Sequence, residues 1–401
     1  MIKNLQKFIR QLKEKGVSCR GSIVSQILKN ERIKRNLTLN ELAEGVCSVS
    51  YLSKLENCLI KSNDLFYTQL FEKMDIDFNM VNLEEYENLL EEVIKYYFLN
   101  DYDNIYKIYN ELKSVPNNTN ISLVNCFYYL KNSEYDLFMK SFNELSEVKE
   151  CLGYFEGITY IYLAIAFYIQ NYNFEKALDY LHSIEMLEIN NRYLNYLLIE
   201  ANIYVSAMYD KPSRLLVYYN KLNDLSFIGY PNGKRIEMRL LYNLVISDEF
   251  LYDALEEIET INFNEIPDDN RFNVLYYIYL IKLKTKNYKY IFEDIYKKGY
   301  FIESRFLGLM GYCAYWLNDD ELYKTIFDIV SNYTFNENDA YHQQFICFLL
   351  MYSSNTNDND LISYLRNEVV GQIKNRYLYL YNEIFVDVYM GLLKKLKLKK
   401  T

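Results

Sequence analysis

The chain has 401 residues, of which 50% are hydrophobic and 24% charged, and its formal net charge is −10. Such a composition is ordinary for a globular protein and allows two or three domains. No run of about 18 uncharged apolar residues is present, and the basic N-terminus lacks the apolar stretch and cleavage site of a secretory signal. These features predict no membrane span and a cytoplasmic location.

Catalytic and metal-binding proteins usually carry residues that are scarce in this chain. The seven Cys are scattered without a C-x-x-C pair, and the only His are His182 and His342. Scattered thiols are typical of a reducing compartment, and these residues do not suit a zinc site. The common nucleotide-binding, serine-hydrolase and zinc-protease motifs are absent. We predict a protein that is not an enzyme and uses no metal or cofactor, with dephosphorylation of a partner as the one enzymatic role left open.

Charge is unevenly distributed along the chain. Residues 1–62 contain twelve of the 44 Lys and Arg but only five of the 54 Asp and Glu, a net charge of +7, so the remaining residues carry −17. A basic segment attracts polyanions, and neutralisation of phosphates is the usual sequence-independent source of nucleic-acid affinity. The alternative is a solvated basic surface without a partner.

The first helix of a small domain is predicted after a basic extension. Residues 1–21 form this extension, which is either a further helix or an arm that contacts DNA. Within residues 22–36, Ile23, Ile27 and Leu28 have the spacing of an amphipathic helix.

Two short helices follow. Thr38 and Glu41 are spaced as a capping box, which predicts a helix that starts at Thr38. Ser48 is positioned to cap the next helix, whose Leu52 and Leu55 point inward. A fourth helix closes the domain, which we place at residues 22–80.

Two short helices joined by a tight turn are typical of a helix-turn-helix, whose second helix lies in the major groove of DNA. Ser hydroxyls at the start of that helix can bond to bases, Val49 can touch a thymine methyl group, and Lys54 and Lys61 suit phosphates. A bundle that only imitates this arrangement is the alternative. The predicted DNA-contacting residues are Thr38, Asn40, Ser48, Val49, Ser50, Tyr51, Ser53, Lys54 and Lys61.

The segment LNELAEGVCSVSYLSKLEN (Leu39–Asn57) resembles the Xre-type helix-turn-helix of the PlcR/Rgg branch. It departs from that pattern at Leu39, where Gln is common, and at Cys58, where Gly is common. The positions that match are Leu42, Cys47, Ser48, Ser50, Leu52, Ser53, Leu55 and Glu56.

The rest of the chain is repetitive. Related stretches recur at intervals of 32 to 39 residues, each after a Tyr-rich helical run, close to the period of the tetratricopeptide repeat. We predict a linker helix at 81–100 and, at 101–401, about eight helix pairs stacked as a right-handed solenoid, in an all-α fold. The second helices are predicted to begin at Tyr102, Tyr135, Phe174, Pro212, Leu251, Tyr288, Asp320 and Asp358.

Polar residues among the apolar first helices of these pairs are candidate ligand contacts. An Asn amide both donates to and accepts from a peptide backbone, so a ladder of amides can hold an extended chain. The alternative is that these side chains bond neighbouring helices. The predicted peptide-binding residues are Asn125, Asn195, Asn202, Arg239, Asn243, Asn273 and Gln344.

An Xre-type domain followed by such repeats resembles the RRNPP family of Gram-positive bacteria. The resemblance implies a cytoplasmic homodimer that binds double-stranded DNA and a short signalling peptide, as a transcriptional regulator in quorum sensing. The alternative is an adaptor whose repeats sequester a protein partner such as a response regulator. Whether the regulator activates or represses, and which peptide and operator it binds, stay open.

Overall fold

The structure is a computed structural model of the chain, and it describes residues 2, 4–16, 23–57, 60, 62–78, 88–114, 118–209, 211–225, 230–247, 249–266, 268–335, 339–354, 356–370 and 379–398. Among these residues every regular element is helical and none is a strand, which confirms the predicted all-α fold class. The chain divides into two compact units, one of residues 1–167 and 179–198 and the other of residues 168–178 and 199–401.

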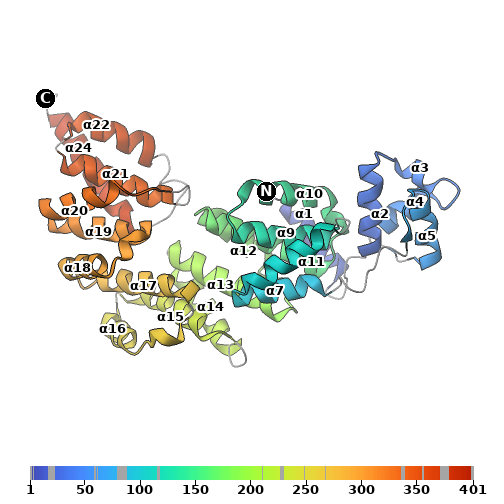
Figure 1. Cartoon of the computed structure of the whole chain (residues 1–401), viewed down its shortest axis with the longest axis horizontal. Coiled ribbons are helices and arrows are strands. Elements are labelled where there is room, and N and C mark those ends of the chain that lie inside the picture. The colour runs from blue at the N-terminus through green and yellow to red at the C-terminus, as the bar shows by residue number, and fades with distance from the viewer. Residues whose placement is uncertain are drawn as a thin grey trace. The chain divides into compact units, whose positions relative to one another are not determined.

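Most helices of the N-terminal part are labelled in Figure 1. This part contains α1 (Leu5–Lys15), α2 (Ile23–Lys34), α3 (Leu39–Ala43), α4 (Val49–Glu56), α5 (Asp64–Glu72), α7 (Leu89–Leu99), α8 (Tyr102–Glu111), η2 (Leu112–Ser114), α9 (Thr119–Lys131), α10 (Tyr135–Val148), η3 (Lys149–Cys151), α11 (Tyr154–Gln170) and α12 (Phe174–Ile184).

The C-terminal part continues the alternation of longer and shorter helices. It contains α13 (Arg192–Met208), α14 (Pro212–Leu225), α15 (Asn232–Ile246), α16 (Leu251–Glu259), η4 (Phe263–Glu265), α17 (Asp268–Leu283), α18 (Tyr288–Lys298), η5 (Tyr300–Ile302), α19 (Ser304–Leu317), α20 (Asp320–Val330), α21 (Ala340–Ser353), α22 (Asp358–Tyr364), η7 (Leu365–Val370) and α24 (Tyr379–Leu398).

Helices α2 to α5 form the head, a small bundle with its own core. The fully buried side chains of Leu28, Leu52, Leu55, Leu70 and Phe71 come from α2, α4 and α5 and pack together. Because each of these helices is short, burial of one apolar face against its neighbours supplies the stability that an isolated helix of this length lacks. The side chain of Ile23, also predicted to face inward, lies outside the described residues.

The repeats follow the predicted period. Helices α8, α10, α12, α14, α16, α18, α20 and α22 begin at the residues predicted for the second helix of each pair. Within the first unit α9 and α10 lie side by side, and in the second unit α18 packs on α19 (Figure 1). Of the predicted linker, residues 81–87 lie outside the described residues, and the remainder forms α7, which packs against α8 and α9.

The basic N-terminal extension forms α1, and α1 belongs to the repeats rather than to the head. Phe8, Ile9 and Leu12 are buried on one face of α1. The ring of Phe8 meets the ring of Tyr160 on α11, with centroids 6.1 Å apart. Gly157, one turn earlier on α11, admits Leu12, since a Cβ there would lie 2.4 Å from a Leu12 methyl carbon.

Both ends of α1 are also held by hydrogen bonds. The backbone amide of Ile2 donates to the Tyr180 hydroxyl at 3.0 Å. At the other end the Lys15 ammonium donates to the carbonyl oxygens of Glu150, at 2.5 Å, and Leu152, at 2.7 Å. The head is therefore inserted between two helices, α1 and α7, that both pack on the repeats.

In the second unit the core is rich in stacked aromatic rings. Phe345 on α21 and Tyr381 on α24 stack with centroids 3.8 Å apart. The Tyr381 hydroxyl reaches the Nδ1 atom of buried His342 at 3.0 Å. Across the part of the chain that the structure describes, no helix combines the length and the apolar character that crossing a bilayer requires.

Candidate functional site

The first helix of the helix-turn-helix starts at the predicted capping box. The Thr38 hydroxyl accepts from the Glu41 amide at 3.2 Å, and the Thr38 amide donates to the Glu41 carboxylate at 2.7 Å. These contacts fix the start of α3, and the hydrogen bond from the Thr38 amide lowers the pKa of the Glu41 carboxyl group. The other end of α3 is held by the Lys73 ammonium, which donates to the carbonyl oxygens of Glu41, Leu42 and Glu44.

The turn between the two helices uses a glycine. Gly45 has φ +75°, a left-handed conformation that residues with a side chain rarely adopt. The chain then reaches Ser48, whose hydroxyl accepts from the Tyr51 amide at 3.2 Å and caps α4. Leu52 and Leu55 face the core as predicted, so the opposite face of α4 is directed to solvent.

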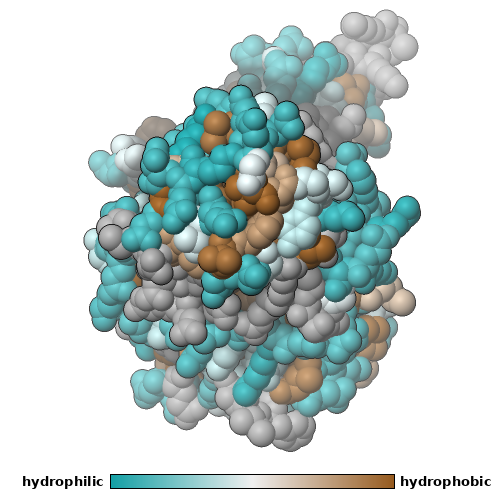
Figure 2. Space-filling model, turned by 90° about the vertical axis from the view of Figure 1, so that its right-hand side faces the viewer, coloured by the Kyte–Doolittle hydropathy of each residue, from teal (hydrophilic) through white to brown (hydrophobic). Residues whose placement is uncertain are grey.

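That exposed face holds four of the nine residues predicted to contact DNA. Ser48, Val49, Ser50 and Lys54 are exposed at or along α4, and Val49 is 40% exposed. Figure 2, which views the molecule from the side of the head, shows a mostly hydrophilic surface interrupted by small hydrophobic areas.

The other predicted DNA contacts have different surroundings. Thr38 and Asn40 are exposed at the start of α3, but the Thr38 hydroxyl also donates to Glu41. Tyr51 and Ser53 are half-buried, and the Tyr51 hydroxyl donates to Ser62 at 3.2 Å. Lys61 lies outside the described residues.

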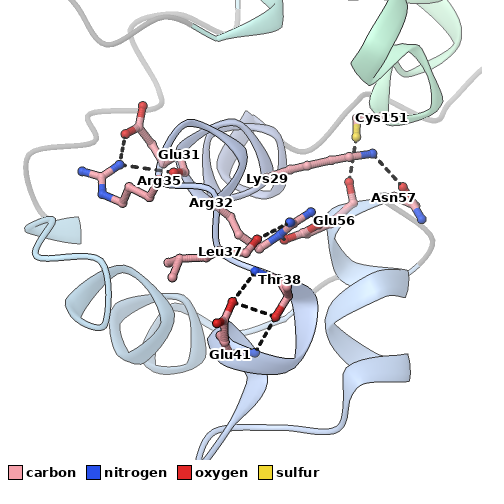
Figure 3. Close-up of polar contacts among 10 residues, drawn as sticks. All are labelled: Lys29, Glu31, Arg32, Arg35, Leu37, Thr38, Glu41, Glu56, Asn57 and Cys151. Carbon is pink, nitrogen blue, oxygen red and sulfur yellow. Dashed lines mark hydrogen bonds and ion pairs between the residues drawn. The ribbon is translucent and has the colours of Figure 1, made fainter.

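A nearly buried ion pair joins α4 to α2. Arg32 donates through Nε and Nη2 to the two carboxylate oxygens of Glu56, at 2.7 and 2.8 Å. Its Nη1 donates to the Leu37 carbonyl oxygen at 2.7 Å, and the exposed fractions of the two charged side chains are 13% and 3%. This two-pronged contact fixes the orientation of α4 (Figure 3). Glu56 was singled out by its match to the Xre pattern, whereas Arg32 carried no signal that identified it as the partner.

The end of α4 also meets the repeats within the first unit. The Cys151 thiol on η3 donates to the Glu56 carbonyl oxygen at 2.8 Å, as drawn in Figure 3. Lys29 on α2 donates to the side-chain oxygen of Asn57 at 3.0 Å. Since Lys15 of α1 bonds the residues beside Cys151, η3 touches both α1 and the head.

The seven residues predicted to bind a peptide differ in burial and in bonding partners. Asn125 on α9, Asn195 on α13 and Gln344 on α21 are half-buried. Asn202 on α13 is buried and accepts from the Arg214 guanidinium at 3.0 Å through Nε.

The other predicted peptide contacts bond carboxylates of neighbouring helices. Arg239 and Asn243 on α15 both donate to Glu257 on α16, at 2.8 and 2.6 Å. Asn273 on α17 donates to Glu237 at 3.2 Å and accepts from Arg305 at 2.7 Å. These contacts match the alternative of bonds between helices.

Glu237 is the centre of a buried polar cluster in the second unit. Its carboxylate accepts from Asn270 at 2.8 Å as well as from Asn273. Burial raises the pKa of the Glu237 carboxyl group, although its hydrogen bonds and the nearby Lys234 oppose that rise. Lys234 itself pairs with Glu200 at 3.0 Å. Because these groups bond to one another across helices, the cluster holds α13, α15 and α17 together.

A cavity of about 500 Å³ lies among the C-terminal halves of α13, α15, α17 and α19 and the start of α24. It was not predicted, because its lining comes from helices far apart in the sequence. Over the described residues, no cluster of three or more His, Cys, Asp or Glu side chains has the geometry to hold a metal ion.

No protein-family model matches the chain, and no curated protein matches its sequence. Among solved structures, Bacillus thuringiensis PlcR in complex with the peptide PapR7 and DNA is similar at 16% identity and a TM-score of 0.34, over 66% of this chain and 97% of that one. A mutant of PrgX is similar at 15% identity and a TM-score of 0.32, over 66% and 95%. Scores this low do not assign a function to this chain.

Proposed function

We propose that this protein is a cytoplasmic transcriptional regulator that binds double-stranded DNA through its head and is controlled by a ligand bound to its repeats. The observation that carries the proposal is the exposed face of α4, where Ser48, Val49, Ser50 and Lys54 stand together. This face is held in a fixed orientation by the Ser48 cap and the Arg32–Glu56 pair.

The positive charge near the head comes mostly from the segment that precedes it. Of the net +7 of residues 1–62, residues 1–21 contribute +5 (six basic, one acidic) and residues 22–62 contribute +2 (six basic, four acidic), so the head is expected to attract DNA through local basic side chains such as Lys54 rather than through its net charge. A helix of eight residues such as α4 can enter the major groove and place its first side chains against base edges. The resemblance of this segment to Xre-type regulators favours the same use.

We further propose that the ligand is a short signalling peptide and that the protein acts as a homodimer in quorum sensing. The resemblance of the whole chain to RRNPP regulators suggests both. The contacts of η3 with α1 and with the end of α4 give a route by which a change in the first repeats can alter the position of the head.

The test begins with genome-wide footprinting of the tagged protein, followed by anisotropy titrations of the enriched duplexes with the purified full chain. Lys54→Ala should weaken binding by roughly three- to tenfold and reduce the salt slope by about one. Lys107→Ala, an exposed lysine on α8, is the matched control and should change neither.

Ligand control is tested by adding synthetic peptides encoded in short open reading frames beside the gene. One of them should change DNA affinity, and sedimentation should give a dimer. A protein that enriches no duplex and instead copurifies with a stable protein partner would favour the adaptor function.

A further inference from the structure

The cavity in the second unit has the size and composition of a ligand site that the predicted amide ladder does not account for. Its volume of about 500 Å³ is within the range of small-ligand pockets. Met208 on α13, Leu244 on α15 and Leu280 on α17 form much of the wall. None of the polar residues predicted to bind a peptide lines it.

One side of the cavity is an aromatic surface. Tyr288 at the start of α18 and Tyr312 and Trp316 on α19 all line it. Their ring centroids are 6.1 to 6.2 Å apart in each pairing, so the three rings form one continuous cluster. Trp316 is 41% exposed and is the only Trp in the chain. Packing an open aromatic surface of this kind against a bulky apolar group is energetically favourable.

Charged residues complete the lining. Lys284 and Lys286 come from the connection between α17 and α18, and Glu383 comes from α24. The Lys284 ammonium donates to the Leu244 carbonyl oxygen at 2.6 Å, and Lys286 is exposed. With two cations against one anion, the lining favours an acidic group beside the apolar one.

The amides of the second unit are less suited to clamp a peptide backbone. Asn202 bonds Arg214, Asn243 bonds Glu257, and Asn273 bonds both Glu237 and Arg305. A ligand that recruited these amides would have to break bonds between helices. The cavity requires no such exchange, because most of its wall is apolar.

We propose that this cavity binds a short peptide through one bulky apolar side chain that lies next to an acidic group, either a neighbouring Asp or Glu or the peptide's own carboxylate. The inference rests on the proposed function for the class of ligand. It assigns recognition to the apolar cavity of the second unit and not to the amide ladder.

Emission of Trp316 reports directly on occupancy, because no other Trp contributes. The full chain is titrated with the acetylated pentapeptides Gly-Gly-Phe-Glu-Gly, Gly-Gly-Phe-Lys-Gly and Gly-Gly-Ala-Glu-Gly, and with the free acid phenylpropionate. We expect the Phe-Glu peptide to bind tightest. Replacing Phe by Ala should weaken binding by about tenfold or more, and replacing Glu by Lys by roughly two- to fivefold.

Two variants locate the site. Leu280→Gln, at a half-buried wall position, should weaken binding of the Phe-Glu peptide by at least about fivefold. Lys286→Gln should remove the preference for Glu over Lys, whereas Lys289→Gln, an exposed lysine outside the lining, should leave it unchanged. Circular dichroism melts confirm that each variant is folded, and protection of Trp316 from acrylamide gives a second measure of occupancy.

Three results would each overturn the proposal. They are equal binding of the Phe and Ala peptides, binding of phenylpropionate without any binding of the peptides, and unchanged peptide affinity in folded Leu280→Gln. Weakening by Asn202→Ala or Asn243→Ala without any effect of Leu280→Gln would return recognition to the amides. DNA binding is measured separately with the footprinted duplexes, so failure of the cavity leaves the proposed function standing, and failure to bind DNA leaves the cavity standing.

Discussion

Replacing Arg32 by Met tests whether the ion pair with Glu56 sets the orientation of α4. The substitution keeps most of the aliphatic stem but removes both bonds to the Glu56 carboxylate and the bond to the Leu37 carbonyl. The Glu56 side chain is only 3% exposed, so a charge is left without its partner. Loss of one member of a buried pair costs about 3 to 5 kcal/mol, which is a large part of the stability of a domain this small.

Amide hydrogen exchange is the assay, because it reports the opening free energy of α4 separately from that of the repeats. Exchange in α4 of Arg32→Met should accelerate by an amount that corresponds to about 3 to 5 kcal/mol, while exchange in α11 stays unchanged. Adding Glu56→Leu should recover most of the loss, since an apolar pair can replace an ionic one. Arg35→Met breaks a partly exposed pair with Glu31 just after the end of α2, but Glu31 keeps its pair with Lys34, so the cost should be about 0.5 kcal/mol or less. A change below about 1 kcal/mol in Arg32→Met would refute the assigned role of the pair.

Further predictions concern the capping box, α1 and the buried histidine. The hydrogen bond from Thr38 lowers the pKa of the Glu41 carboxyl group. Its contribution to the stability of α3 is therefore present above the unfolded pKa and should vanish as the pH falls through the folded pKa. Hydrogen exchange of the α3 amides should show this loss in the natural chain but not in Glu41→Gln. Gly157→Ala should displace Leu12 and α1 at a cost of about 1 to 3 kcal/mol, seen as faster cleavage of α1 by trypsin. Burial lowers the pKa of His342 to about 4, below its unfolded value, so stability should be full above about pH 6.5 and fall by roughly 2 kcal/mol near pH 5. Urea unfolding should show this dependence, and His342→Gln should lack it.

Most of the fold could be predicted from local sequence patterns. The Thr38 capping box, the Ser48 cap and the inward Leu52 and Leu55 depend on residues three or four positions apart, and such spacing is visible in a sequence. The starts of the second helices were found for the same reason, since each repeat is a local unit.

Long-range pairings could not be predicted. The basic character of residues 1–21 drew attention to DNA, although Phe8 and Leu12 already marked an apolar face whose partner at Gly157 is over 140 residues away. Asn202 and Asn243 were interpreted as ligand contacts because their spacing sets a direction but does not reveal Arg214 or Glu257 as partners.

The position of α1 gives the head two covalent tethers instead of one. Cleavage at a single site between the head and α7 would leave the head attached through α1. Cleavage on both sides of the head would leave α1 as a separate peptide bound noncovalently to the repeats. A recombinant fragment that begins at α7 therefore lacks a structural part of its own core, and one that ends before α7 carries a helix whose apolar face has lost its partner on α11.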